Sequence, residues 1–118
     1  MTLREKRILF TRLISEFKLW IFSEGWEVAQ DEGTVLSPRA ARRGMERLSV
    51  DDAVHKRNSF HHQGLAEDLN LYREGAYVFD GNDPIWIYLA DKWESMNPLC
   101  TAGLRFQDAN HFSLGEGR

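Results

Sequence analysis

The segment "GLAEDLNLYREGAYVF", residues 64–79, constrains the fold more than any other part of the chain, because its pattern predicts a β-hairpin. Leu65, Leu69 and Leu71 are separated by even numbers of residues, so they would lie on one face of a strand. The opposite face would carry Ala66, Asp68, Asn70 and Tyr72. We expect a turn at residues 73–75, after which "AYVF" would return as the second strand.

An amphipathic helix is expected at the N-terminus, where Thr2 and Glu5 form a capping-box pattern. Its apolar positions recur at helical spacing, and they are Phe10, Leu13, Phe17 and Trp20. Gly25 offers a stop for this helix, and "WEVAQDE" then alternates enough for a short strand. A second helix is expected in "SPRAARRGMERL", with Ser37 as its N-cap and Pro38 at its first position.

After the hairpin, the sequence predicts one more helix, which Asp83 and Pro84 would open and Asn97-Pro98 would end. Its apolar stripe would be Trp86, Leu89, Ala90, Trp93 and Met96. The final segment, "GLRFQDANHFSL", has the pattern of a turn followed by a strand. Together these elements predict a single α+β domain over residues 1–118, with helices packed on one face of a small antiparallel sheet.

Charge and composition exclude several classes of protein. The 118 residues include 15 Lys and Arg against 18 Asp and Glu, and a formal charge of -3 argues against nucleic acid as the main partner. The apolar N-terminal segment is interrupted by Arg12, Glu16 and Lys18, so it lacks the features of a signal peptide and of a membrane span. The single cysteine, Cys100, permits no intrachain disulfide and is interpreted as a small buried thiol.

Asp68 is a carboxylate in a segment that otherwise looks like a half-buried strand. If a neighbouring strand covers its face, Asp68 needs a cation or several hydrogen-bond donors, and small Ala66 beside it leaves room for a ring or an ion. A solvated strand edge is the competing interpretation. His61 lies seven positions earlier, so its side chain and that of Asp68 can meet only if Gln63-Gly64 bends the chain.

A second group of candidate residues lies near the C-terminus, where Asp108 precedes His111 by three residues. One helical turn or tight loop would aim both side chains at one point. His61, Asp68 and His111 are suitable zinc ligands, and three protein ligands leave a fourth position open, as catalytic zinc sites require. Asp108 is then available as a general base. His62 would point away from such a site.

These residues form two motifs, S-x-H-x-x-G-x-A-x-D beginning at Ser59 and D-x-x-H-F beginning at Asp108. Together the motifs resemble those of a zinc peptidase family with a Hedgehog-like fold. This family comprises D-Ala-D-Ala carboxypeptidases and dipeptidases of the VanY and VanX type and phage L-alanyl-D-glutamate endopeptidases. The resemblance is closest over residues 59–114.

By position, the resemblance implies that His61, Asp68 and His111 bind one Zn²⁺ per chain. Asp108 would be the general base for the attacking water, and Ser59 would support the strand that carries the first ligand. Gly64 would have the supporting role of bending the chain between ligands. The resemblance also implies a monomeric catalytic domain without a separate wall-binding module.

One departure from the family pattern concerns an arginine that stabilises the oxyanion or a substrate carboxylate in relatives. It usually stands in a Gly-x-Arg-Ser/Thr-like turn, but the comparable stretch here reads "EGTVLSPRAARRG", with Val35 and Leu36 near that position. Arg39 is the nearest arginine to the turn and is therefore the candidate. A solvated helix face is the competing interpretation for Arg39, Arg42 and Arg43.

The function that the resemblance implies is zinc-dependent cleavage of the peptidoglycan stem peptide. An L-alanyl-D-glutamate endopeptidase of phage endolysin type is favoured, made in the bacterial host cytoplasm without a signal peptide and released to the wall through a holin-type pore. A D-Ala-D-Ala carboxypeptidase or dipeptidase is the alternative among enzymes. A non-catalytic zinc-binding or wall-binding virion module is the alternative from another class, because the missing upstream arginine would suit it.

Overall fold

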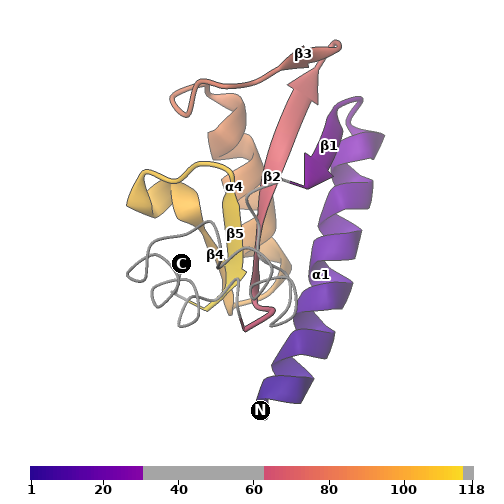
Figure 1. Cartoon of the computed structure of the whole chain (residues 1–118), viewed down its shortest axis with the longest axis vertical. Coiled ribbons are helices and arrows are strands. Elements are labelled where there is room, and N and C mark those ends of the chain that lie inside the picture. The colour runs from indigo at the N-terminus through magenta and orange to yellow at the C-terminus, as the bar shows by residue number, and fades with distance from the viewer. Residues whose placement is uncertain (31–62, 116–118) are drawn as a thin grey trace, which may run out of the picture.

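The computed structural model describes residues 1–30 and 63–115, and Figure 1 shows how their elements are arranged. In chain order the elements are α1 (Leu3–Ser23), β1 (Glu27–Gln30), β2 (Ala66–Arg73), β3 (Ala76–Tyr77), α4 (Ile85–Met96), β4 (Cys100–Ala102), the 3-10 helix η1 (Gly103–Phe106) and β5 (His111–Leu114). The helix expected to begin at Ser37 lies outside the described residues. Within them, the expected α+β architecture is confirmed.

The sheet has five strands in the order β1-β2-β5-β4, with β3 also paired to β2, and every pairing is antiparallel. The predicted hairpin is confirmed, because β2 and β3 are joined by a two-residue loop of Glu74 and Gly75. Both loop residues have positive φ, 54° and 78°, as a type I′ turn requires. β4 was not predicted, and its three residues form a sheet edge beside β5.

α1 begins and ends where the sequence predicted. Thr2 Oγ1 accepts a hydrogen bond from the Glu5 N–H at 3.1 Å, and Glu5 Oε1 accepts one from the Thr2 N–H at 3.2 Å. The helix ends at Ser23, and Gly25 then adopts a left-handed φ of 89°. In the described part of the chain, no helix combines the length and the apolar character needed to cross a membrane.

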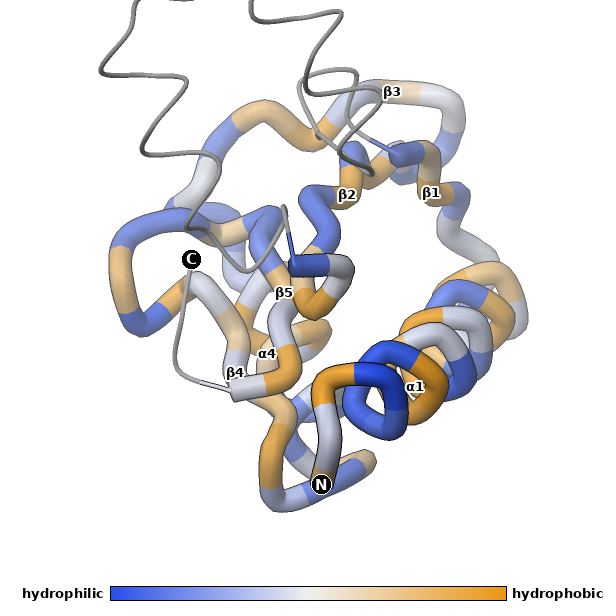
Figure 2. Tube along the Cα trace, turned by 60° about the horizontal axis from the view of Figure 1, so that its bottom comes forward, coloured by the Kyte–Doolittle hydropathy of each residue, from blue (hydrophilic) through white to orange (hydrophobic). Residues whose placement is uncertain are grey.

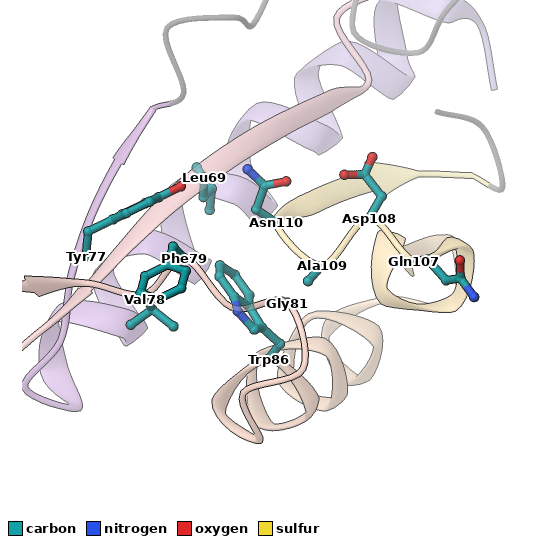
Figure 3. A pocket seen from close by; sticks show the side chains of 10 residues that line it. All are labelled: Leu69, Tyr77, Val78, Phe79, Gly81, Trp86, Gln107, Asp108, Ala109 and Asn110. Carbon is teal, nitrogen blue, oxygen red and sulfur yellow. The ribbon is translucent and has the colours of Figure 1, made fainter.

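Asp83 precedes α4, whose N-cap is Pro84. The Asp83 carboxylate accepts the Ile85 N–H at 3.0 Å and also pairs with Arg73 of β2 at 2.8 Å, which connects the start of the helix to the hairpin. The predicted apolar stripe is confirmed, with Trp86, Leu89, Ala90 and Trp93 buried and Met96 partly buried. Trp86 projects toward the segment after β3 and donates its indole N–H to the Asp80 carbonyl at 3.1 Å (Figure 3).

The core is an aromatic cluster between the two helices and β5. The ring centroids of Phe17 and Trp93 are 5.3 Å apart, and those of Phe17 and Phe112 are 4.9 Å apart. Because α1, α4 and β5 each contribute one of these rings, both helices pack on the same face of the sheet (Figure 1). Apolar and polar residues alternate along β2 and around α1 (Figure 2), which gives each element one face for this core.

One residue of β2 departs from the expected separation of faces. Leu65, Leu69 and Leu71 are buried as predicted, but Glu67 has the same parity and is only 9% exposed. Its carboxylate lies 2.6 Å from Lys18 Nζ and accepts a hydrogen bond from Gln30 Nε2 at 3.0 Å. The buried charge is therefore paired, as a carboxylate on a core face must be.

Candidate metal centre

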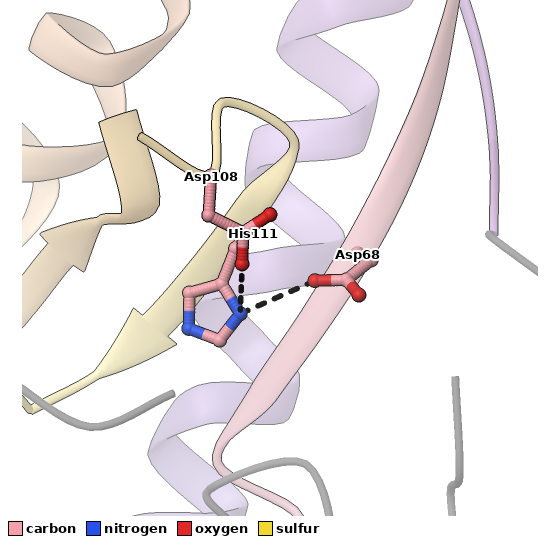
Figure 4. Close-up of side chains that lie close together, drawn as sticks. All are labelled: Asp68, Asp108 and His111. Atoms are coloured by element: carbon pink, nitrogen blue, oxygen red, sulfur yellow. Dashed lines mark hydrogen bonds and ion pairs between the residues drawn. The ribbon is translucent and has the colours of Figure 1, made fainter. Parts of the chain in front are cut away.

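Strand pairing brings Asp68 and His111 together. They are direct partners on β2 and β5, and the neighbouring Leu69 N–H donates to the Asn110 carbonyl at 2.9 Å. This register makes Asp68 and His111 a non-hydrogen-bonded pair, the kind in which cross-strand side chains are closest. Asp68 Oδ1 lies 3.2 Å from His111 Nδ1 (Figure 4).

The turn before β5 adds Asp108 to this pair. Its N–H donates to the Gly103 carbonyl at 2.9 Å, and its carbonyl accepts the His111 N–H at 3.1 Å. Gln107, just before it, has a left-handed φ of 61°, an uncommon conformation for a residue other than glycine. The turn places Asp108 Oδ2 3.9 Å from His111 Nδ1, so both carboxylates face the same ring nitrogen (Figure 4).

Gly103 is a functional residue that sequence reasoning missed. A Cβ at this position would overlap the Asp108 carbonyl oxygen and would lie 2.6 Å from His111 Cβ, closer than real Cβ atoms approach. Only glycine therefore fits beneath the turn that carries both candidate site residues. The signal available in the sequence was a glycine at the start of the segment "GLRFQDANHF", between the two elements that the turn connects.

The donor atoms of the cluster suit a metal ion. One ligand atom from each of Asp68, Asp108 and His111 lies within 4.8 Å of the others. Two ligands that each lie about 2.0–2.1 Å from a tetrahedral zinc ion are about 3.3 Å apart. The 3.2 Å between Asp68 Oδ1 and His111 Nδ1 matches that separation. Because the same distance also suits a direct hydrogen bond between the two side chains, metal analysis distinguishes the two arrangements.

The exposure of the three side chains separates Asp108 from the other two. The His111 side chain is fully buried and that of Asp68 is 25% exposed, whereas that of Asp108 is 42% exposed. Asp108 is also farther from His111 Nδ1 than Asp68 is. The arrangement fits Asp68 and His111 as ligands and Asp108 as an acid that a substrate can reach.

Small side chains occupy the positions beside the Asp68–His111 pair. Ala66 and Ser113 form the cross-strand pair next to it, and both are buried. The Ser113 hydroxyl donates to the Gly115 carbonyl at 2.8 Å, so this buried polar group is satisfied within the fold. Ala66 is buried on β2, and the expected room for a ring or an ion beside it stays a prediction.

A bend was expected between His61 and Asp68, and the chain turns at Gln63 and Gly64. Gly64 adopts a left-handed φ of 75° two residues before β2 begins, and Arg7 Nε of α1 donates to the Gln63 carbonyl at 2.6 Å. His61, Ser59 and Arg39 lie outside the described residues. The roles of His61 as a zinc ligand, Ser59 as its support and Arg39 as the oxyanion cation therefore stay predictions.

An ion pair anchors the segment that leads to Asp108. The Glu94 carboxylate of α4 accepts the Ala102 N–H at 2.9 Å and the Arg105 Nε–H at 2.8 Å. Burial of Glu94 acts to raise its pKa, but the hydrogen bonds from Arg105 and Ala102 outweigh burial and lower the pKa from its ordinary value of 4.5. α4 thus holds both the end of β4 and η1. Sequence reasoning did not single out Glu94 or Arg105.

Cys100 has the character of a core residue, as expected. Its side chain is buried at the start of β4, where the residue pairs with Leu114. Burial raises the pKa of the thiol to about 12, so Cys100 stays protonated at neutral pH. Its burial and protonation are those of an inert core thiol and not of a reactive thiolate.

Comparisons of the chain with protein-family models, with curated proteins and with solved structures found no match in any of the three. The resemblance to zinc peptidases is therefore a prediction that depends on the two sequence motifs alone. The geometry of Asp68, Asp108 and His111 is independent of that resemblance, because it follows from strand register and turn conformation.

Proposed function

We propose that the chain is a zinc-dependent peptidoglycan peptidase with the Hedgehog-like fold, and that it acts as an L-alanyl-D-glutamate endopeptidase of phage endolysin type. The observation that carries this proposal is the convergence of Asp68, Asp108 and His111 within 4.8 Å. These residues come from two separate sequence motifs, and both motifs are typical of the same peptidase family. A cluster of this kind is what those motifs require.

In this proposal, His61, Asp68 and His111 hold the zinc ion. Bound zinc supplies a Lewis acid that polarises a carbonyl and lowers the pKa of water to about 7. β2 positions Asp68 and β5 positions His111, and the pairing of these strands places the two donor atoms 3.2 Å apart. Rigid strands are suitable supports, because a metal site requires its ligands to be held in place.

Asp108 is the proposed general base. It accepts a proton from the attacking water, whose oxygen bonds to the scissile carbonyl carbon, and it delivers that proton to the amine as the C–N bond breaks. Its partly exposed carboxylate and its position beside His111 suit this role. Arg39 is proposed, on the resemblance alone, as the cation that stabilises the oxyanion.

The position of Asp108 also favours an enzyme over a structural metal module. A structural zinc site is usually closed by four ligands and has no use for a partly exposed acid beside them. Here Asp108 lies 3.9 Å from His111 Nδ1, so it is near the ligands and still accessible from outside. An acid that is both near the metal and accessible is expected in a catalytic site, where it must contact the substrate.

The test is digestion of purified peptidoglycan by the zinc-loaded protein, with mass spectrometry of the fragments. An endopeptidase exposes new N-terminal D-glutamate, whereas a D-Ala-D-Ala carboxypeptidase releases D-alanine. A chelator should abolish cleavage, and the Asp108→Ala variant should keep its zinc and lose activity. If the zinc-loaded protein binds walls without releasing fragments, the domain is a binding module and the proposed activity is wrong.

A further inference from the structure

A pocket of about 210 Å³ opens beside Asp108 (Figure 3). Leu69 of β2 contributes to its lining, together with Tyr77 and Phe79 from the hairpin and the segment after it. Trp86 of α4 and Asn110 from the turn before β5 line it as well. The volume is below the roughly 300–1,000 Å³ of pockets for drug-sized ligands, so it suits a single residue of a larger substrate.

The pocket combines a fixed wall with an exposed rim. Trp86 is 3% exposed, and its indole N–H is held by the Asp80 carbonyl at 3.1 Å. Phe79, by contrast, is 84% exposed, and Tyr77 is 50% exposed. Large aromatic side chains that stay in contact with water at the edge of a pocket are well placed to cover a ligand. The pocket therefore has a fixed wall at Trp86 and an exposed aromatic surface at Phe79 and Tyr77 that a ligand can contact.

The charge that the described lining residues give the pocket is negative. Among the described residues that line it, Asp108 carries the only charged side chain. A ligand carboxylate placed here would lie near a second carboxylate and would lose part of its hydration, and both effects oppose its binding. An uncharged carboxamide placed here would meet no such repulsion, and the lining already includes the polar side chains of Gln107 and Asn110. The lining therefore favours a neutral polar group over an acid.

We propose that this pocket is the subsite for the substrate residue that supplies the leaving amine, and that it selects a carboxamide over a free carboxylate on that residue. The inference rests on the proposed function, in which Asp108 delivers the proton to that amine. The residue bearing the amine must then lie on the Asp108 side of the scissile bond, where the pocket opens. A stem peptide with D-isoglutamine after L-alanine is accordingly preferred to one with D-glutamate.

The experiment compares two synthetic stem peptides that differ only in the α-carboxamide or α-carboxylate of the residue after L-alanine. For the zinc-loaded protein, kcat/KM should favour the carboxamide by about tenfold or more, given the repulsion between nearby like charges. Phe79→Lys adds a cation at the exposed rim and should bring the ratio toward one. Ile87→Lys is the matched control, because Ile87 is 56% exposed on α4 and does not line the pocket, and it should leave the ratio unchanged.

Equal cleavage of the two peptides, or a ratio that Phe79→Lys leaves unchanged, would overturn the subsite while the peptidase activity stands. If zinc is bound and neither peptide is cleaved, the proposed function is at fault. The subsite is then tested by titrating the protein with two dipeptides that begin with D-isoglutamine or with D-glutamate. The chemical shift of the Trp86 indole N–H is measured by NMR in each titration. A larger shift with the D-isoglutamine dipeptide supports the subsite, and equal or absent shifts overturn it.

Discussion

The two faces of β5 are both buried but are built from opposite chemistry. Phe112 faces the helices and packs against Phe17 and Trp93. His111 faces the other way, where Asp68 and Asp108 lie within 3.2 Å and 3.9 Å of its Nδ1. The four-residue strand β5 thus contributes Phe112 to the apolar core and His111 to the candidate metal centre. Substitutions on the Phe112 face should therefore change mainly the stability of the fold, and substitutions on the His111 face should change mainly metal binding and activity.

The largest expected effect concerns the polar face. Asp108→Asn removes the proposed proton acceptor, so kcat should fall by about 100-fold to 10,000-fold. Because Asp108 is partly exposed, the free energy of unfolding should change little, by about 0.5 kcal/mol or less. Muropeptide release and thermal unfolding measure the two effects. Unchanged release would remove Asp108 from the mechanism.

The matching change on the apolar face is Phe112→Ala. It removes a ring that is 0% exposed and contacts Phe17 and Trp93, so unfolding should become easier by about 3–5 kcal/mol. Denaturant titration measures this loss. Any molecules that stay folded should still bind zinc, because the substitution leaves the residues of the other face in place. A selective loss of zinc with full stability would contradict the division between the faces.

A smaller effect is expected beneath the turn. Gly103→Ala introduces a Cβ that would collide with the Asp108 carbonyl and His111 Cβ, so the turn must shift. Zinc affinity should fall by about 10-fold to 100-fold, as it does when groups that orient ligands are disturbed. Competition with a chromophoric chelator measures this change. Gly25→Ala is a control for a strained glycine, because Gly25 also has a positive φ, 89°, but follows the end of α1 and lies away from the site.

The smallest effect concerns the Glu94–Arg105 anchor. The pKa of Glu94 is lower in the folded protein than its ordinary value of 4.5, so its stabilising contribution is present above that value. The contribution is lost as the pH falls through the lower, folded-state pKa. Glu94→Gln should therefore reduce stability at neutral pH by about 1 kcal/mol or less, and the difference should shrink in acid. Melting temperatures of both proteins across this pH range test the sign.

The sequence predicted the regular elements because their signals are local. The capping box at Thr2 and the turn at Glu74-Gly75 act within a few residues, and the structure confirms both. The burial of Glu67 on the core face was not predicted, because its partner Lys18 lies on α1 and is distant in the chain. β4 was missed because a three-residue strand is defined mainly by the neighbour that it pairs with.

The candidate site was predictable in its residue types and not in its geometry. The spacing of Asp108 and His111 indicated a shared turn, but the left-handed Gln107 and the close packing of Gly103 depend on the folded backbone. The approach of Asp68 to His111 depends on the register between β2 and β5, which no local pattern encodes. His61 lies outside the described residues, so its role stays a prediction.

The turn between β2 and β3 helps to fix the orientation of Asp68, which lies at the other end of β2. A slip of one residue in β2 would turn Asp68 toward the helices and expose the leucines on the other face, because side chains alternate along a strand. Glu74 and Gly75 help to prevent that slip by pairing Tyr72 with Tyr77. At about 3.3 Å per residue, the turn lies roughly 20 Å along the strand from Asp68. Substitutions in this exposed turn are therefore expected to disturb the candidate metal centre without contacting it.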